Sequence, residues 1–300
     1  MAEPTVISLV ERAPAKVNLT LRVRGRRGDG YHGIESIVAF AHIGDRVALI
    51  RDQPLGVEIR GPFAAALGEP GENLVVKAAA ALQREFKKVR LGRFTIIKHL
   101  PVAAGLGGGS ADAAAALRLI ARMNNLKLSD SRIFAAARVS GADVPVCLES
   151  RMRLMRGIGD ILSDPILLPP LSAVLVNPGI ALATKDVFAA LDRPPVAPDQ
   201  NDPVSPRRVF PREVRPFIEH LQGETNDLEP VAISLRPIIA DVLTALGSTS
   251  GCRLARMSGS GPTCFALFDD AGAASAAARK LKEQHPEWWV AATLLGSAEA

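Results

Sequence analysis

A glycine-rich segment in the first half of the chain has the composition of a phosphate-binding loop. Gly105-Leu-Gly-Gly-Gly-Ser110 follows a strand-like stretch and precedes an alanine-rich stretch with helical spacing. Consecutive glycines let the backbone approach a ligand, and the start of a helix adds unpaired N–H groups and a positive dipole end. Together these features bind anions, most naturally phosphate, and Ser110 can cap the helix or offer its hydroxyl to a phosphate or a metal. A turn that merely packs a helix on a sheet needs only one or two glycines.

Two familiar nucleotide-binding motifs do not fit this loop. It lacks the Gly-Lys-Ser/Thr ending of a Walker A loop, and Ser110 stands where a dinucleotide-binding fingerprint has its third glycine. Gly28-Asp-Gly-Tyr-His-Gly33 does match that fingerprint, but a strand-like pattern follows it, and Tyr31 and His32 would crowd a pyrophosphate. The glycine loop therefore predicts a phosphate site of another type.

A second glycine-rich turn lies in the other half of the chain. Met257-Ser-Gly-Ser-Gly-Pro262 joins two predicted strands, and by itself it could be a simple hairpin turn. Next to a first phosphate loop, a second group of N–H donors is expected to share the ligand. The residues of this second glycine loop are Ser258, Gly259, Ser260 and Gly261.

Two charged residues lie in apolar surroundings. Lys16 belongs to the strand-like segment Ala13-Pro-Ala-Lys-Val-Asn18, and Asp143 to the turn-bounded segment Gly141-Ala-Asp-Val-Pro145. A buried carboxylate needs a partner, so one possibility is an ion pair between Lys16 and Asp143. The alternatives are a lysine that faces solvent and an aspartate that caps a turn.

Two neighbouring rings, Tyr31 and His32, lie in the turn-rich stretch 25–33. They are either exposed residues of a turn or a flat surface on which a base can stack. Phe188 is a further stacking candidate, although phenylalanine more often lies in the core.

Hydrophobic periodicity predicts the elements that position these residues. The first half should contain strands over 5–24 (interrupted around 13–16), 34–51 (broken at 44–45), 55–60 and 94–97, and helices over 73–86, 111–124 and 130–138. The second half should contain strands over 171–177, 252–257, 263–268 and 288–294, and helices near 213–221, 227–245 and 272–284. The β-turn-β-α-β order at its end predicts a small α+β sandwich. The proline-rich stretch 165–170 predicts a boundary between domains 1–164 and 165–300, and residues 193–211 predict a long surface loop.

The composition is that of a globular protein of about two domains. Of the 300 residues, 48% are hydrophobic and 22% charged, and the net charge of +5 suits anionic ligands. The basic residues are spread along the chain, which argues against nucleic-acid binding. Three widely spaced cysteines favour a reducing, cytoplasmic compartment, and no apolar run approaches the length of a membrane span.

Taken together, these motifs resemble those of the GHMP kinase superfamily, which includes galactokinase and the homoserine, mevalonate and phosphomevalonate kinases. The segment 101–115 is similar to its central phosphate loop, and 13–18 and 258–262 are similar to its first and third motifs. Within the superfamily, the set is most similar to the kinases that act on a cytidyl diphosphate sugar alcohol. Gly-Ile-Gly-Asp160, Asn177-Pro-Gly and Thr225-Asn-Asp-Leu-Glu-Pro230 extend the similarity, which runs from residue 13 to 268.

The resemblance implies a fold and a reaction. The fold is a two-domain GHMP kinase fold (α+β or α/β), with an N-terminal domain like domain 2 of ribosomal protein S5 and a ferredoxin-like C-terminal domain. ATP would donate its γ-phosphoryl group to a hydroxyl of the cytidyl compound, in non-mevalonate isoprenoid precursor synthesis. Mg²⁺ would accompany ATP through phosphates and waters without a dedicated carboxylate cluster. We expect a monomer or weak homodimer.

The same resemblance assigns roles to individual residues. Asp143 would accept or orient the hydroxyl proton, and Lys16 would keep Asp143 ionised and offset charge on the transferred oxygens. Tyr31 and His32 would contact the cytosine, with Phe188 stacking from the far side. The ATP-binding set is Asn73, Lys98, Pro101, Val102, Ala103, Ala104, Gly105, Leu106, Gly107, Gly108, Gly109, Ser110 and Ala111. The substrate-binding set is Asn18, Tyr31, His32, Ile158, Thr184 and Phe188.

Two alternative functions stay open at this point. Another small-molecule kinase of the superfamily, of the homoserine or mevalonate type, would not need the stacking surface of Tyr31, His32 and Phe188. A non-catalytic nucleotide-binding or RNA-binding protein would not need the Lys16–Asp143 pair. Two departures from the family pattern, His99 and the length of the 193–211 loop, concern the periphery of the site.

Overall fold

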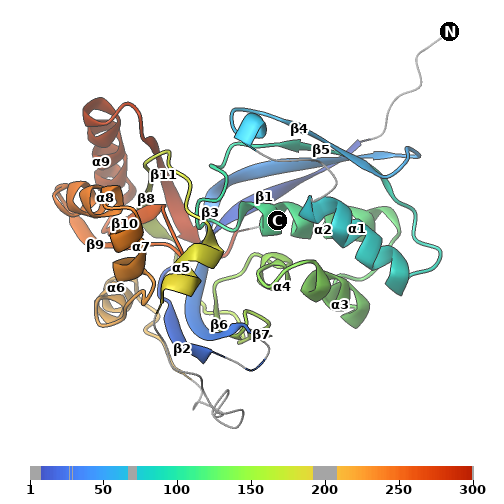
Figure 1. Cartoon of the computed structure of the whole chain (residues 1–300), viewed down its shortest axis with the longest axis horizontal. Coiled ribbons are helices and arrows are strands. Elements are labelled where there is room, and N and C mark those ends of the chain that lie inside the picture. The colour runs from blue at the N-terminus through green and yellow to red at the C-terminus, as the bar shows by residue number, and fades with distance from the viewer. Residues whose placement is uncertain (1–7, 27, 29, 67–72, 192–207, 299–300) are drawn as a thin grey trace.

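The two halves of the chain share one mixed β-sheet in the computed structural model (Figure 1). The structure describes residues 8–26, 28, 30–66, 73–191 and 208–298, so most of the predicted loop at 193–211 lies outside the described residues. The described helices include none with both the length and the apolar content required to cross a bilayer.

The strands of the first half are β1 (Ser8–Asn18), β2 (Arg22–Arg26), β3 (His32–Arg51), β4 (Gly56–Arg60), β5 (Gly92–Ile97), β6 (Arg153–Gly157) and β7 (Ile161–Leu162). Its helices are the 3₁₀ turn η1 (Ala64–Ala66), α1 (Leu74–Glu85), α2 (Gly108–Met123), α3 (Ser131–Ser140) and α4 (Val144–Cys147). The second half contains β8 (Leu171–Asn177), α5 (Thr184–Ala190), α6 (Val214–Gln222), α7 (Glu229–Leu235), α8 (Ile238–Gly247), β9 (Cys252–Met257), β10 (Cys264–Phe268), α9 (Ala271–Gln284) and β11 (Trp289–Gly296).

The long strand β3 is the centre of the sheet, and it pairs with β1, β2, β5, β6 and β11. The predicted break at 44–45 is wrong, because Gly44 continues the strand where β1 crosses it closely. A Cβ atom on Gly44 would lie 2.2 Å from the carbonyl oxygen of Ala13. The predicted interruption around 13–16 is likewise only a register shift between Pro14 and Lys16 within the continuous strand β1.

The second half has the βαββαβ order of a ferredoxin-like domain. Its strands lie in the order β11-β8-β10-β9, all neighbours being antiparallel, which confirms the expected fold. The single helix predicted over 227–245 is wrong: α7 and α8 are separate, and Pro237 lies between them. Proline lacks the N–H that would continue the helix and disfavours helical geometry at the residue before it. Helix α5 was not predicted.

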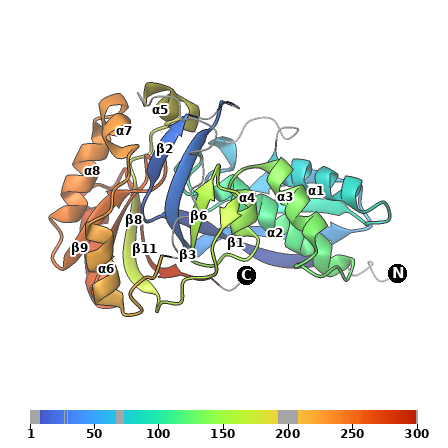
Figure 2. The same ribbon diagram turned by 90° about the horizontal axis from the view of Figure 1, so that it is seen from below.

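Alternate residues of β3 face two different hydrophobic cores. Val38 and Phe40 pack with helices α1 to α4, whereas Ile37 and Ala39 pack with the second half of the chain. This is the two-residue period of a strand that is buried on both faces. Figure 2 shows α1 to α4 beside the first half of the sheet, and α6 to α8 at the opposite end of the molecule.

Helix α2 begins three residues earlier than its alanine pattern predicted. The predicted start is Ala111, but Gly108 to Ser110 already form the first turn, with Gly107 as the N-cap. Its alanines are buried against β1 and α1, so the helix lies close to the sheet. The helix at 73–86 is confirmed as α1, and the side chain of Asn73 caps it by accepting the N–H of Val75 at 2.9 Å.

A buried cluster of three ionisable side chains fixes the start of α2. The Lys98 ammonium donates to Asp45 and, at 2.8 Å, to Asp112 in the second turn of α2. The remaining oxygen of Asp45 accepts the N–H groups of His99 and Leu100. Burial acts to lower the pKa of Lys98, but the charges of Asp112 and Asp45 outweigh it and raise that pKa. Burial raises the pKa of Asp112 to about 7, Lys98 opposes this rise, and Asp45 adds to it.

The cluster predicts how stability depends on pH. The folded protein holds the Asp112 proton up to about pH 7, whereas the unfolded chain releases it near pH 3.8. Stability therefore falls as pH rises between these values, and this contribution is absent from Asp112→Asn. Melting temperatures from pH 5 to 8 should show wild type losing stability relative to Asp112→Asn. The exposed Asp241→Asn on α8 should run parallel to wild type; a parallel curve for Asp112→Asn would contradict the prediction.

Candidate active site

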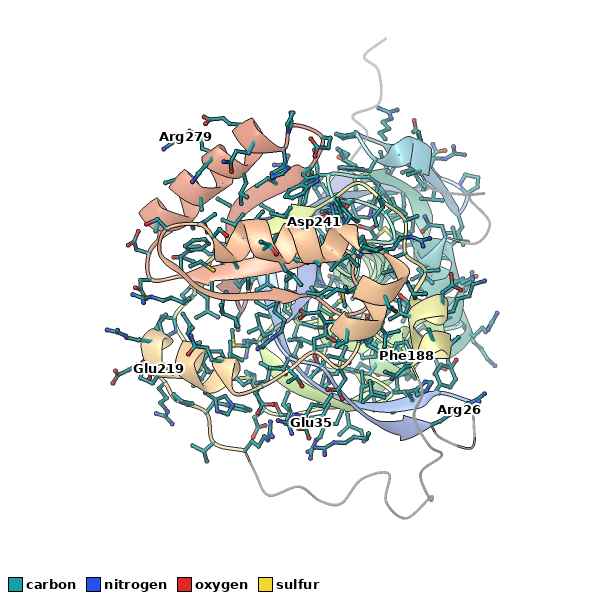
Figure 3. All side chains as sticks on the ribbon, turned by 60° about the vertical axis from the view of Figure 1, so that its left-hand side comes forward. Arg26, Glu35, Phe188, Glu219, Asp241 and Arg279 are labelled. Atoms are coloured by element: carbon teal, nitrogen blue, oxygen red, sulfur yellow. The ribbon has the colours of Figure 1, made fainter. Side chains whose placement is uncertain are left out.

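A cleft of about 1250 Å³ lies between the two glycine loops, the end of the β2–β3 hairpin and helix α5. Figure 3 shows Arg26 at the end of β2 and Phe188 on α5 on the same side of the molecule, and both line the cleft. The cleft therefore receives side chains from both halves of the chain.

The first glycine loop leaves its helix start open to a ligand. Gly107 is the N-cap of α2 with a φ of 60°, and no side chain caps the first N–H groups of the helix. The side chain of Lys16 fills the space that a Cβ atom on Gly107 would take, at 3.1 Å from Lys16 Cε. Leu106 lies buried in the core between the halves, and its carbonyl accepts the N–H of Lys16 at 2.8 Å. The loop is thus fixed on its protein side and offers N–H donors on the other.

The second glycine loop packs directly on the first. The Ser258 hydroxyl donates to the Gly105 carbonyl at 3.0 Å and accepts the N–H of Asn18 at 3.1 Å. Gly105 has a φ of 72°, and a Cβ atom there would lie 2.5 Å from the Ser258 carbonyl oxygen. Only glycine fits this contact, so the two loops form one continuous wall of the cleft.

The predicted ion pair joins Lys16 and Asp143. Lys16 Nζ lies 2.9 Å from Asp143 Oδ2 and also donates to Asn18 Oδ1 at 3.0 Å. The Lys16 side chain is 5% exposed, whereas that of Asp143 is 34% exposed on the cleft side. The Asn18 amide in turn donates to the Ser36 hydroxyl at 2.7 Å. The buried ammonium therefore has two partners, Asp143 and Asn18, while the carboxylate stays open to a ligand.

Two contacts from outside the cleft position Asp143. Arg118, on the buried face of α2, donates to the carbonyls of Cys147 and Leu148 at the end of α4, the short helix that follows Asp143. On the other side, the turn before β7 approaches so closely that a Cβ atom on Gly159 would lie 3.0 Å from the Ala142 carbonyl oxygen. The residue before the carboxylate is thus held in place by the Gly-Ile-Gly-Asp turn.

The predicted stacking residues meet at the far end of the cleft. The rings of His32 and Phe188 stack with centroids 5.0 Å apart and planes at 29°. Burial, and secondarily the charge of Arg26, lower the pKa of His32, so its imidazole is neutral at pH 7. Tyr31 is 59% exposed at the mouth, and Thr184 on α5 is hydrogen-bonded to Ser260 of the second glycine loop at 2.8 Å.

Most of the predicted site residues line this one cleft. Those that do are Lys16, Asn18, Tyr31, His32, Asn73, Lys98, the segment 101–110, Asp143, Ile158, Thr184, Phe188, Gly259 and Ser260. Ala111, Ser258 and Gly261 do not line it: they lie buried behind the loops. The Lys98 ammonium is taken up by Asp45 and Asp112, as described above.

Several lining residues were not predicted from the sequence. Arg26 and Lys185 bring positive charge to the end of the cleft that holds the rings, and Ala142 and Met155 line the cleft as well. Arg26 pairs with His32 across the hairpin, a relation that depends on strand register. Lys185 directly follows Thr184, a predicted site residue, so its place in the cleft could have been predicted from that neighbour.

Comparison with known proteins places this site in a family. The model of the GHMP kinase N-terminal domain matches residues 73–151, and that of the GHMP kinase C-terminal domain matches residues 212–287. The chain is 53% identical to a 4-diphosphocytidyl-2-C-methyl-D-erythritol kinase of Xanthobacter autotrophicus, covering 95% of this chain and 98% of that protein. It is 51% identical to the kinase of that name from Rhodopseudomonas palustris, covering 97% and 96%.

Solved structures agree with this placement. A crystal structure of 4-(cytidine 5'-diphospho)-2C-methyl-D-erythritol kinase is 32% identical and superposes with a TM-score of 0.75, covering 97% of this chain and all of the other. A homoserine kinase from Cytophaga hutchinsonii shares the fold at 20% identity and a TM-score of 0.70, covering 99% and 98%. The chain therefore belongs to the 4-diphosphocytidyl-2-C-methyl-D-erythritol kinase family within the GHMP kinases.

Proposed function

We propose that this protein transfers the γ-phosphoryl group of ATP to the 2-hydroxyl of 4-diphosphocytidyl-2-C-methyl-D-erythritol, releasing ADP and the 2-phosphate. The observation that carries the proposal is the Lys16–Asp143 pair, which opens into a cleft shared by the glycine loops and the His32–Phe188 rings. The product would be an intermediate of non-mevalonate isoprenoid precursor synthesis.

The ion pair performs the proton and charge work of the transfer. Asp143 orients the 2-hydroxyl and accepts its proton as the oxygen bonds to the γ-phosphorus and the bond to the ADP oxygen breaks. Lys16, 2.9 Å away, favours the ionised carboxylate and offsets negative charge on the transferred oxygens. Asn18 shares the ammonium and keeps it from rotating away from the reacting atoms.

The glycine loops position ATP. The uncapped N–H groups at the start of α2 bind the phosphates, as oriented backbone dipoles do in phosphate sites. Asn73 and Lys98 line the cleft and are assigned to the adenosine end. Ala111, behind the loop, supports it without lining the cleft.

The side chains near the loop fit a Mg²⁺ ion carried by ATP. Among the residues that the structure describes, no three His, Cys, Asp or Glu side chains gather into a metal site. The Ser110 hydroxyl lines the cleft at the start of α2 and is the oxygen donor we assign to the ion, whose other ligands would be phosphates and waters. When bound, Mg²⁺ would offset the charge of the phosphates.

The ring end of the cleft recognises the cytidyl group. Tyr31, His32 and Phe188 offer ring faces to the base, while Arg26 and Lys185 place positive charge where the substrate diphosphate must pass. Thr184 and Ile158 complete this end of the cleft. A small aliphatic acceptor would leave these groups without a ligand.

We also propose that residues 1–164 and 165–300 act as two domains of a monomer or weak homodimer in the cytoplasm, with small molecules rather than nucleic acids as partners. The three cysteines are all free thiols, which suits a reducing compartment.

The identity of the compound that accepts the phosphoryl group is the most direct test of the proposed function. ADP release should be measured with ATP and Mg²⁺ and with the cytidyl compound, homoserine or mevalonate added separately. Turnover with the cytidyl compound alone is expected. Turnover with another acceptor would overturn the assignment of Tyr31, His32 and Phe188, and ATP binding without turnover of any acceptor would favour a binding protein.

Replacing the proposed base should affect turnover rather than ATP binding. Asp143→Asn should lower kcat by about 10²-fold or more, the usual size of a lost general base, and leave the Kd of ATP within a few-fold. The matched control is Asp241→Asn on the outer helix α8 (Figure 3). Unchanged turnover in Asp143→Asn would remove this carboxylate from the mechanism.

Removing the His32 ring should weaken the binding of the cytidyl compound and leave the binding of ATP unchanged. His32→Ala loses the stacked ring at the cytidyl end, so the KM of the cytidyl compound should rise about tenfold while the KM of ATP stays unchanged. His42→Ala, which removes an exposed imidazole on β3, is the control. Equal loss of affinity for both substrates would instead mean that His32 only maintains the structure of the hairpin.

A further inference from the structure

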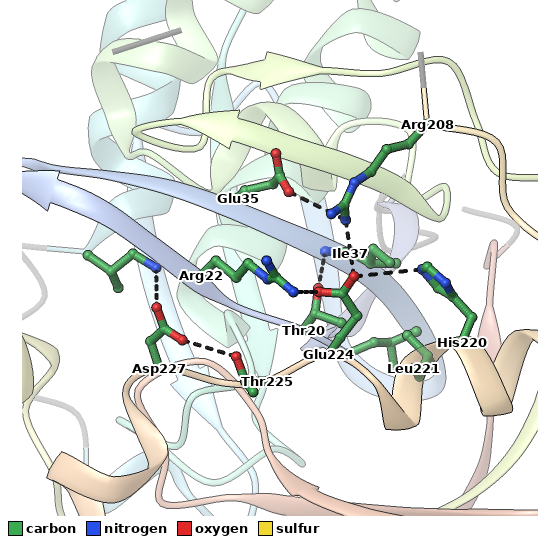
Figure 4. A network of polar contacts seen from close by, with 12 residues as sticks. Thr20, Arg22, Glu35, Ile37, Arg208, His220, Leu221, Glu224, Thr225 and Asp227 are labelled. Carbon is green, nitrogen blue, oxygen red and sulfur yellow. Dashed lines mark hydrogen bonds and ion pairs between the residues drawn. The ribbon is translucent and has the colours of Figure 1, made fainter. Parts of the chain in front are cut away.

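A network of buried charges lies outside the cleft, at the base of the β2–β3 hairpin (Figure 4). Its two carboxylates are Glu35 on β3 and Glu224, which follows α6. Their side chains are only 5% and 8% exposed, so each carboxylate needs a cation to stay ionised. Neither residue lines the cleft.

Three arginines from two segments supply these cations. Arg22 on β2 lies 2.8 Å from Glu224, and Arg24 lies 3.0 Å from Glu35. Arg208, in the segment before α6, lies 3.4 Å from both carboxylates. Arg208 is therefore the cation that joins the carboxylate of the hairpin to the carboxylate of the second half.

Backbone contacts place the base of the hairpin beside the same segment. The N–H of Leu21 donates to the Thr225 carbonyl at 2.9 Å, and the N–H of Asp227 donates to the Leu21 carbonyl at 2.8 Å. The Asp227 carboxylate accepts the N–H of Val23 at 3.0 Å. The His220 ring lies 3.9 Å from the Glu224 carboxylate and is its third partner after Arg22 and Arg208. The base of the hairpin is thus attached to the residues after α6.

The other end of the same hairpin carries the ring that contacts Phe188. Arg22 pairs with Glu35 at the base, and Arg26 pairs with His32 four residues further along β2. At about 3.3 Å per residue, the charge network lies roughly 13 Å from this end. The hairpin is therefore attached to the second half at two points: the charges at its base and the His32–Phe188 stack in the cleft.

We propose that Arg208 and Glu224 are positioning residues for the cytidyl end of the cleft. They fix the angle of the hairpin and thereby the spacing of Tyr31 and His32 from Phe188, which sets the affinity for the cytidyl group without contact with it. This inference rests on the proposed function, because it names the part of the protein that confers selectivity for that substrate.

The loss of Arg208 has a defined consequence. Glu35 and Glu224 would each keep one arginine, Arg24 and Arg22, but would lose the guanidinium that they share. Two carboxylates repel one another in a poorly solvated place, so the hairpin base would shift relative to the 224–227 segment, although the hydrogen bonds of Leu21 still attach it. The glycine loops have their own contacts, Ser258 to Gly105 and Lys16 to Leu106, so the ATP end should not move.

The test compares Arg208→Gln with Arg212→Gln, which removes the same charge from an exposed position four residues along. In Arg208→Gln, the KM of the cytidyl compound and the Kd of CDP, measured by calorimetry, should both rise about tenfold, and the KM of ATP should stay within twofold. Arg212→Gln should match wild type. Equal rises for both substrates, or no change in CDP affinity, would overturn the proposal.

Two further variants keep the test decisive. Arg208 contacts both carboxylates through the single nitrogen Nη1, and Arg208→Lys keeps the charge on a shorter side chain with a more strongly hydrated head group, so it should weaken CDP binding by an intermediate factor. It also replaces Arg208→Gln if that variant does not fold, and wild-type affinity for CDP in Arg208→Lys would then overturn the proposal. Glu224→Gln combined with Arg208→Gln should lose less than the product of the single effects.

CDP binding separates this inference from the proposed function. Wild-type protein that binds CDP but does not phosphorylate the cytidyl compound would refute the reaction and still allow the variants to be compared. Wild-type protein that turns over the compound, with unaltered CDP affinity in the Arg208 variants, would support the reaction and refute the positioning role.

Discussion

The Lys16 ammonium is held on a strand whose two faces are both covered by hydrophobic core, and this burial constrains the whole site. A charge in such a place is tolerated only with partners, and Asp143 and Asn18 are those partners. The short helix α4, its contact with Arg118 and the turn at Gly159 all serve to bring one carboxylate to this ammonium. One ion pair therefore both neutralises a buried charge and supplies the two groups proposed for catalysis.

The site is assembled where the two halves of the sheet meet. The end of the cleft with the glycine loops depends on the contact between Gly105 and Ser258, which joins loops from opposite halves. The end with the rings depends on the contact between His32 and Phe188, which also joins the two halves. Because both halves contribute to each end of the cleft, neither half contains a complete cleft. Charged residues at the junction between the halves are therefore expected to affect substrate binding without touching the substrate.

Local signals in the sequence predicted much of the site. The glycine runs, the helix start at Asn73 and the apolar setting of Asp143 depend on neighbouring residues, and the structure brings all three to the cleft. The Asp45–Lys98–Asp112 cluster and the Arg208–Glu35–Glu224 network join residues far apart in the chain, so no local pattern could reveal them. The separation of α7 from α8 was predictable from Pro237 and was missed because apolar periodicity continued across it.

The pairing of β11 with β3 also has a consequence for how the protein folds during synthesis. Leu295 pairs with Ala41, roughly 250 residues earlier in the chain, a contact of very long range that costs entropy to close and slows folding. Until β11 leaves the ribosome, this part of β3 has an unpaired edge, and the ferredoxin-like half lacks the strand that borders β8. The growing chain therefore carries an open sheet edge from the synthesis of β3 until that of β11, and open edges are where strands aggregate most readily.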